Sequence, residues 1–302
     1  MRLMRGVPDR PTRAPAIAAV HHWLDGAHAH LRSVAPDLDG LVTDYVGEAR
    51  FGAAVIAKDL AELAPDATVL EVGAGALLLS CALHAAGYRV TALEPVGVGF
   101  SHMTHLRGLV LDYASSHGAA PSLMSVPAEA LDARAAFDYA FSINVMEYVD
   151  GVDRVLQRVW SALRPGGAYR FVCPNYSFPF EPHFGIPTCW GKELTWRLFR
   201  RRILASRVVV DPAGTWQSLN WITVRRVRHV CRREFGVPPV FDRDVSYRFV
   251  RRALSDPSFQ RRHGVAMRVA ARALTATGLI SLARFVPAAA QPAMSCRITR
   301  PV

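Results

Sequence analysis

Short apolar segments alternate with helical segments over much of the chain, and this alternation limits it to few folds. Five segments have the length and composition of buried strands, and they lie at residues 68–72, 88–93, 123–126, 137–143 and 168–173. Apolar residues at helical spacing predict helices at residues 48–63, 77–86, 100–116 and 147–163. Strands that are connected through helices pair in parallel, with right-handed crossovers. The sequence therefore predicts an α/β fold built on a doubly wound parallel sheet.

The composition indicates a globular chain. Of its 302 residues, 51% are hydrophobic and 20% are charged, which excludes intrinsic disorder. The five cysteines are an odd set without a Cys-x-x-Cys pair, so we expect free thiols and neither disulfides nor a thiolate zinc site. The longest uncharged stretch, 72–88, contains glycines and a histidine and suits a loop and a buried helix better than a membrane span. The N-terminus lacks an apolar run of signal-peptide length, so a cytoplasmic location is expected.

Charge is distributed unevenly along the chain. Residues 1–191 carry 14 basic and 19 acidic side chains, whereas residues 192–302 carry 22 and 6. Such asymmetry can indicate an anionic partner. However, 34 of the 36 basic residues are arginine, which together with the many alanines suggests a codon bias. We therefore do not take the charge as evidence for a partner, and the oligomeric state is left open.

Residues 1–40 are expected to form a polar, solvated N-terminal extension. Four histidines in this segment raise the question of a metal site, and they are His21, His22, His28 and His30. They lack a cysteine or carboxylate set with the spacing of metal ligands, so no metal is expected.

The strongest local motif is a glycine-rich turn between the first strand and the next helix. Gly73 and Gly75 allow a sharp turn and a close approach of a ligand to the backbone, and the following helix N-terminus offers free N–H groups. Glu94 ends the second strand at the distance along the chain where an acid reaches ribose hydroxyls. A dinucleotide site would need a third glycine where this chain has Leu78, which disfavours NAD. The pattern predicts an adenosyl ligand.

Residues 67–173 resemble the class I S-adenosylmethionine-dependent methyltransferases. The resemblance is carried by the following segments in order: Glu71-Val72-Gly73-Ala74-Gly75-Ala76, Leu93-Glu94-Pro95, Pro127-Ala128-Glu129, residues 137–149 and Arg164-Pro165-Gly166-Gly167. It implies a Rossmann-like, seven-stranded methyltransferase sheet, whose last strands would come from the region after residue 234. It also implies S-adenosyl-L-methionine as the cofactor.

The same resemblance implies roles for individual residues. Glu71 would lie near the methionine amino group, directly or through water, and Asn144 near the methionine end and the transferred methyl. The turn residues Gly73, Ala74 and Gly75 would line the cofactor. The remaining positions would be Glu94 and Pro95 at the ribose, and Ala128 and Glu129 at the adenine. For Glu129, an acid that is merely solvated is the competing interpretation.

The loop after the fifth strand holds the candidate catalytic residues, which are His183, Glu181 and Tyr176. This stretch resembles a subgroup of bacterial class I enzymes with Asn-Tyr and then Glu-Pro-His-Phe in the same place. Because the carboxyl ends of parallel strands face the ligand crevice, the loop should lie over the methyl group. A histidine suits proton removal from a hydroxyl near neutral pH, and Glu181 could orient it. A packed, structural His183 is the alternative.

The rest of the chain divides into three parts by pattern. Residues 41–175 form the expected cofactor-binding core, and residues 176–234 an inserted aromatic and Arg-rich cap over the acceptor pocket, with a tryptophan set of Trp190, Trp196, Trp216 and Trp221. Residues 235–302 would complete the sheet and include an amphipathic helix. Its basic side contains Arg261, Arg268 and Arg272, and its apolar side Met267, Ala270 and Leu274. Packing of that apolar side on the core is preferred over contact with a membrane surface.

These features predict methylation of a small-molecule acceptor, at oxygen in preference to nitrogen or carbon. Nucleic-acid methylation is the first alternative, but Asn144-Val145-Met146-Glu147 stands where amino-adenine enzymes have Asp/Asn-Pro-Pro-aromatic. Cys173 ends the fifth strand as in some RNA enzymes, without the companion Pro-Cys at the fourth. A regulatory protein that binds the cofactor without catalysing transfer is the second alternative.

Overall fold

A seven-stranded mixed sheet forms the centre of the protein, here described from a computed structural model for residues 16–95, 101–255 and 268–302. The strand order is β3-β2-β1-β4-β5-β9-β8. The strands are β1 (Thr68–Val72), β2 (Arg89–Leu93), β3 (Ser122–Met124), β4 (Phe137–Ile143), β5 (Leu163–Pro174), β8 (Val240–Phe241) and β9 (Ala293–Thr299). Strands β1 to β5 pair in parallel, as predicted, and the last two strands come from the region after residue 234.

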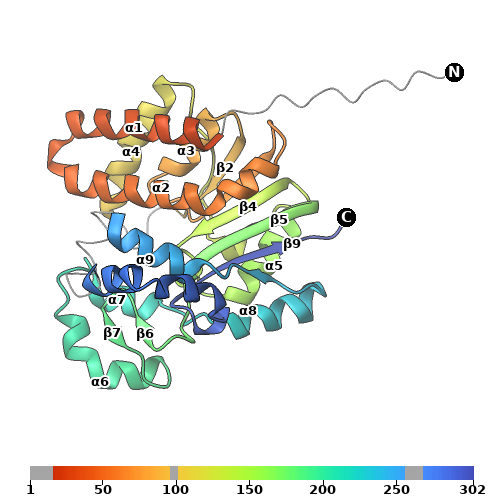
Figure 1. The fold of residues 1–302 in the computed structure, drawn as a ribbon. Coiled ribbons are helices and arrows are strands. Elements are labelled where there is room, and N and C mark those ends of the chain that lie inside the picture. Colours follow the sequence, from red (N-terminus) through yellow and green to blue (C-terminus); the bar gives the residue numbers. More distant parts are fainter. Residues whose placement is uncertain (1–15, 96–100, 256–267) are drawn as a thin grey trace.

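Strand β9 reverses the direction of the sheet. It pairs antiparallel with β5 from Ala168↔Thr299 to Pro174↔Ala293, and antiparallel with β8 on its other side. Strand β9, near the end of the described chain, therefore lies between β5 and β8, which both come earlier in the sequence (Figure 1).

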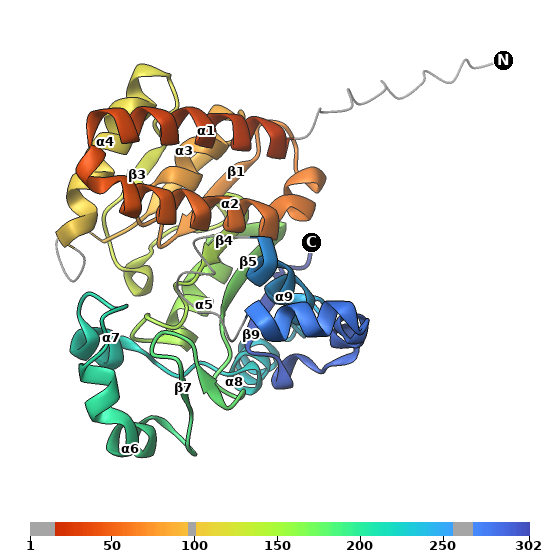
Figure 2. The same ribbon diagram turned by 60° about the vertical axis from the view of Figure 1, so that its left-hand side comes forward.

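Helices cover both faces of the sheet (Figures 1 and 2). One face is covered by α1 (Ala16–Val34), α2 (Asp39–Glu62), α3 (Leu78–Ala85) and α4 (Ser101–Ser116). The other face is covered by α5 (Val152–Ala162) and α8 (Val224–Val230). Alternation along β1 serves both layers, because Val69 joins the first core while Leu70 and Val72 join the second.

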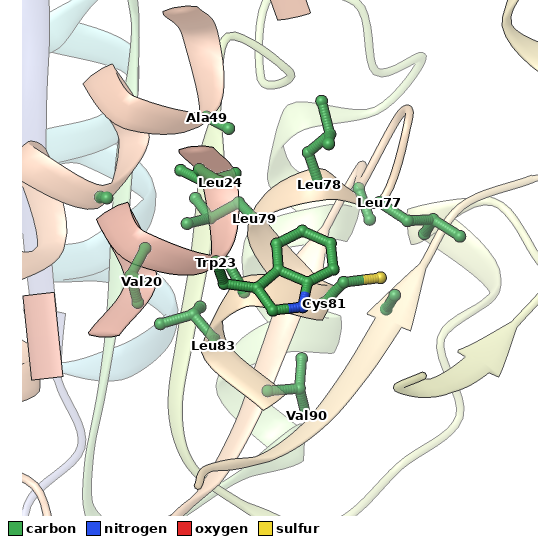
Figure 3. Close-up of a cluster of buried hydrophobic side chains, with 14 of the residues drawn as sticks. Val20, Trp23, Leu24, Ala49, Leu77, Leu78, Leu79, Cys81, Leu83 and Val90 are labelled. Atoms are coloured by element: carbon green, nitrogen blue, oxygen red, sulfur yellow. The ribbon is translucent and has the colours of Figure 1, made fainter. Parts of the chain in front are cut away.

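Helix α1 corrects the expectation of a solvated N-terminal extension. Figure 3 shows Val20, Trp23 and Leu24 of α1 directed toward Leu79 and Leu83 of α3. All five side chains are buried, so α1 packs into the core from Val20 onward. The sequence suggested otherwise because the histidines and other polar residues of α1 occupy its exposed face, whereas the apolar positions recur at helical spacing.

The helix that follows β4 is shorter than expected. We predicted a helix over residues 147–163, but α5 begins at Val152, and Met146, Glu147 and Tyr148 form a turn. The backbone N–H of Gly151, the N-cap of α5, donates to Glu129 Oε1 at 3.1 Å. This start of α5 keeps residues 146–148 at the carboxyl end of the sheet.

The segment after β5 forms a separate group of short elements. Helices α6 (Lys192–Leu204) and α7 (Pro212–Ser218) lie together on one side, away from α9 (Val245–Ser255), as Figure 2 shows. A two-stranded ribbon of β6 (Phe180–Glu181) and β7 (Ile186–Pro187) connects them to the sheet. A π-helical turn at Cys231–Phe235 extends α8.

The amphipathic helix near the C-terminus differs from its prediction. Arg261 and Met267 lie outside the described residues, and the helix is described from residue 268 to 276. Ala270 and Leu274, expected to pack on the core, are exposed, and Ala271 is buried instead. Ala271 contacts Ala253 of α9, because the helix is rotated relative to the expected orientation.

Candidate functional site

The turn after β1 brings the backbone of three residues into the left-handed region. Gly73 has φ +73°, Gly75 φ +53° and Leu77 φ +67°, the last of which is unusual for a residue with a side chain. The N–H of Gly73 donates to Leu93 O at 2.8 Å, which joins the turn to the end of β2. A Cβ on Gly73 would lie 2.4 Å from Val145 Cγ2, so only glycine fits there. The turn is narrow and leads directly into α3.

Glu94 lies beside this turn, as the sequence predicts. Its Oε2 accepts the N–H of Gly75 at 3.0 Å, and its Oε1 accepts from Arg107 Nη2 at 3.3 Å. Arg107 Nε in turn donates to Gly75 O at 3.1 Å. The side chain of Glu94 is 19% exposed, and a carboxylate with two such bonds still has lone pairs for ribose hydroxyls. The acid and the glycines therefore form one constellation that fits an adenosyl group.

Glu71 lies on β1, before the turn, and its carboxyl group contacts α3. Its carboxyl is buried and accepts a hydrogen bond from Ser80 Oγ of α3. Burial raises the pKa of Glu71 to about 8, although the bond from Ser80 opposes this. In this structure Glu71 connects β1 with α3. Its predicted contact with the methionine amino group stays a prediction, as do the roles of Ala74, which is buried in the turn, and Pro95, which is exposed after β2.

Three further candidate residues lie beyond strands β3 and β4. Ala128 is buried at the start of a 3₁₀ turn, Ala128–Ala130, and the carboxylate of Glu129 accepts the N–H of Gly151. Asn144 directly follows β4 in a left-handed conformation with φ +54°, and its Nδ2 donates to Glu48 Oε2 of α2 at 3.2 Å. Asn144 is exposed, at the carboxyl end of the central strands.

Tyr176, Glu181 and His183 form a hydrogen-bonded trio beyond β5. Glu181 is fully buried, and its Oε1 accepts from Tyr176 Oη at 3.3 Å and lies 2.5 Å from His183 Nδ1. Backbone N–H groups of His183 and Phe184 also donate to this carboxylate, at 3.2 and 2.8 Å. Because the carboxylate only accepts, Nδ1 carries the hydrogen, and in the neutral imidazole Nε2 keeps its lone pair. The sequence had predicted these three residues, and the structure brings them together.

The environment of His183 favours its protonated form. Burial lowers the pKa of the imidazole, but the hydrogen bond and charge of Glu181, together with the charge of Glu147, outweigh it and raise the pKa. The side chain is 21% exposed, and its ring meets the Tyr148 ring edge-on at 5.5 Å between centroids. One side of the imidazole is thus accessible while the other is held.

Glu147 is a buried acid near the trio that the sequence analysis did not single out. It is fully buried in the turn after β4, and neither carboxyl oxygen has a hydrogen-bond partner within the described part of the chain. Burial raises its pKa to about 7, although the charge of His183 opposes this. We had assigned residue 147 to a helix. The sequence signal that could have identified Glu147 is its position just after the end of a strand.

Aromatic side chains pack around the trio. Trp221 stacks on Tyr176 with 5.0 Å between ring centroids, and Trp216 packs against Trp221, Trp196 and Phe184. Trp190, which we had grouped with them, is 99% exposed and does not belong to this cluster. The cluster forms an apolar wall beside the buried carboxylates.

The cysteines have the properties of packed thiols. Cys173, at the end of β5, is fully buried, and burial raises the pKa of its thiol well above the usual range. No disulfide links the five cysteines. Within the described ranges, no group of three or more His, Cys, Asp or Glu side chains is arranged to hold a metal ion. His28, one of the N-terminal histidines, lies 3.2 Å from Thr43 Oγ1.

Comparisons with known proteins agree with this arrangement. Residues 70–171 match the family described as "Methyltransferase domain", a span that contains the glycine turn, Glu94 and strand β4. The chain is 41% identical over 283 residues to a Mycobacterium tuberculosis (strain H37Rv) protein named Uncharacterized protein Rv1509, covering 94% of this chain and 96% of the relative. The chain therefore belongs to the class I S-adenosylmethionine-dependent methyltransferases. It is a methyltransferase whose cofactor is S-adenosyl-L-methionine.

Solved structures with similar folds include two methyltransferases. Haemonchus contortus phosphoethanolamine N-methyltransferase 2 has a TM-score of 0.48 and 12% identity, and the match covers 91% of this chain and 60% of that one. Burkholderia thailandensis 1,6-didemethyltoxoflavin-N1-methyltransferase has a TM-score of 0.46 and 17% identity, with 97% and 93% covered. No helix in the described segments is both long and apolar enough to cross a membrane.

Proposed function

We propose that the protein transfers a methyl group to an oxygen atom of a small-molecule acceptor, with His183 as the general base. The observation that carries this proposal is the hydrogen-bonded trio of Tyr176, Glu181 and His183 beyond the carboxyl end of β5. A histidine whose Nδ1 is held by a buried carboxylate presents Nε2 for proton transfer. An amine with a free lone pair does not need such a base, whereas a hydroxyl does.

The proposed cofactor residues surround the carboxyl ends of β1, β2 and β4. S-adenosylmethionine supplies a methyl group that the positive sulfur already activates. In the proposal, Gly73, Ala74 and Gly75 provide the backbone on which it lies and Glu94 accepts its ribose hydroxyls. The methionine end faces Glu71 and Asn144. The remaining contacts, around the ribose and the adenine, come from Pro95, Ala128 and Glu129.

His183 completes the reaction by removing one proton. The acceptor O–H bond breaks as its proton moves to Nε2, and the oxygen forms a bond to the methyl carbon while the carbon–sulfur bond breaks. Glu181 stabilises the resulting imidazolium through Nδ1–H, and Tyr176 fixes Glu181 by donating to it. The protein otherwise contributes alignment of the three reacting atoms.

The aromatic wall supports an acceptor with a ring or an apolar body. Trp221, which is partly exposed, offers a flat surface beside the trio, and the buried Trp216 packs against it. Nucleic-acid methylation is less well supported, because the Cys173 thiol is buried and its raised pKa keeps it protonated, whereas a cytosine enzyme needs an accessible thiolate.

The test compares His183→Gln with the wild type over a panel of phenols, quinone precursors and glycans, with formation of S-adenosylhomocysteine as the readout. Wild-type turnover should rise with pH, because the raised pKa of His183 leaves less free base at neutral pH. The variant should lose about 100-fold or more in turnover, together with this pH dependence. Cofactor affinity, measured by calorimetry, should not change.

The control is His229→Gln, which changes an exposed histidine on α8. Unchanged turnover of His183→Gln from pH 6 to 9 would remove the base from the proposal. Cofactor binding without transfer to any acceptor class would favour a regulatory protein instead.

A further inference from the structure

Glu147 has a buried carboxyl group that has no role in the reaction proposed above. Both its oxygens lie out of solvent without a hydrogen-bond partner in the described part of the protein. Buried polar groups are almost always paired, because an unpaired one loses its hydration without compensation. A group kept in such a state at the acceptor side of a site calls for a functional explanation.

The position of Glu147 is fixed through its backbone. The N–H of Asn220 donates to Glu147 O at 2.8 Å. The side-chain Nδ2 of Asn220 donates to Met146 O at 2.8 Å and to Val149 O at 2.7 Å. Three hydrogen bonds thus hold the turn, and the adjacent Tyr148 packs its ring against that of His183. The turn therefore holds Glu147, which is fully buried, next to the residue that packs on His183, and the charges of Glu147 and His183 act on each other.

Several charged and titratable groups face this location from different elements. Glu181 in β6 holds Nδ1 of His183, and Tyr176 after β5 donates to Glu181. Tyr148 is in the turn with Glu147. Glu48 of α2, whose charge also acts on Glu147, is paired with Arg252 at 2.9 Å. Arg202 of α6 donates to Gly185 O at 2.9 Å and is exposed to solvent.

We infer that Glu147 is a positioning residue: with Glu181 it forms a buried Glu–His–Glu unit that stabilises His183 once the imidazole has taken the acceptor's proton. This inference rests on the proposed function. As the proton moves to Nε2, the positive charge initially on sulfur ends on the imidazolium. A second buried carboxylate offsets that charge where water cannot. Once protonated, His183 thus gives the buried charge of Glu147 an opposite charge.

The experiment measures the pKa of His183 directly, by NMR titration of the imidazole in the free, full-length protein. In Glu147→Gln the pKa should fall by about 1 unit relative to the wild type, because a neutral amide of similar shape replaces the carboxylate. The matched control is Asp150→Asn, an exposed acid two residues beyond Tyr148, which should leave the pKa unchanged.

Additional measurements keep the inference testable if Glu147→Gln does not fold. Glu147→Asp retains the negative charge at position 147. The pKa of His183 should therefore stay higher in this variant than in one whose residue 147 is uncharged. In the wild type, the side-chain ¹³C resonance of Glu147 should respond to the titration of His183. Equal pKa values of His183 in the wild type and Glu147→Gln, or independent titrations of the two groups, would overturn the inference.

A kinetic readout then relates the pair to catalysis. The acidic limb of the kcat/KM profile should move to lower pH in Glu147→Gln by the same amount as the measured pKa. An unmoved limb despite a shifted pKa would overturn the positioning role. Because the NMR titration needs neither cofactor nor acceptor, its result is separate from that of His183→Gln, which tests the proposed function.

Discussion

At the scale of single residues, the glycine turn shows how little space the proposed cofactor site leaves. Gly73 has both a left-handed backbone and a close neighbour, whereas Gly118 after α4 has φ +62° with open space around its Cβ position. The two glycines therefore separate the backbone penalty from the steric one.

Gly73→Ala should destabilise the protein by about 3 kcal/mol, against about 1 kcal/mol for Gly118→Ala. The added cost at Gly73 comes from the contact with Val145, which must move. Urea unfolding measures both values. Calorimetry should show at least about a tenfold loss of cofactor affinity for Gly73→Ala alone. Equal effects of the two substitutions on stability and affinity would contradict this account.

Individual residues were predictable where the chemistry is local. That Gly75 and Glu94 lie together could be predicted, because a turn and a strand end fix their positions from short sequence patterns. Glu147 was not found, because its importance depends on burial and on side chains from positions 183 and 220, which no local pattern records. The same holds for the pairing of Glu71 with Ser80.

At the scale of elements, the side chain of Asn175 attaches the segment after β5 to the sheet. Asn175 is buried, and its Nδ2 donates to the carbonyl oxygens of Ala288, Ala289 and Gln291 at 2.9 to 3.2 Å. Its Oδ1 accepts from Ser177 N at 3.1 Å. One side chain thus connects the end of β5, the loop that carries Tyr176, and the segment before β9.

Asn175→Asp should destabilise the protein by about 3 kcal/mol at pH 7, because a buried carboxylate would face the carbonyl oxygens that now accept from the amide. Thermal unfolding by circular dichroism measures the loss. Lowering the pH toward 4 should narrow the difference from the wild type, since a protonated acid can donate again. A difference that does not depend on pH would argue against the hydrogen bonds as its cause.

Elements were predictable where periodicity was clear, as for the first five strands. The predicted helix boundary was wrong where a turn breaks the pattern, at residues 146–148. The predicted orientation of the helix at residues 268–276 was wrong because alanines distinguish its two faces only weakly. Helix α1 was missed because polar side chains on its outer face concealed the apolar ones on its inner face.

At the scale of the whole molecule, a buried ion-pair network joins distant parts of the chain. Arg170 of β5 binds Asp59 of α2, contacts Asp242 at 2.8 Å and donates to Ser295 of β9 at 3.1 Å. Tyr139 Oη also donates to Asp59, at 2.8 Å. The network holds one layer of helices and the C-terminal strands to the same point of the sheet.

Asp59→Asn should cost about 3 kcal/mol of stability, because it leaves the buried Arg170 with less compensating charge. The control is Asp153→Asn, whose pair with Arg226 at 2.9 Å is well exposed and should cost less than about 1 kcal/mol. Chemical denaturation of both variants gives the comparison. Similar losses would mean that burial does not distinguish the two pairs.

The place of β9 in the sheet has a consequence for how the protein is made. Strand β8 leaves the ribosome before β9, yet within the described residues it pairs with β9, which follows more than 50 residues later. The parallel half of the sheet can assemble while translation continues. The other edge of β5 stays open until β9 emerges, and during that interval it is a surface on which chaperones could act.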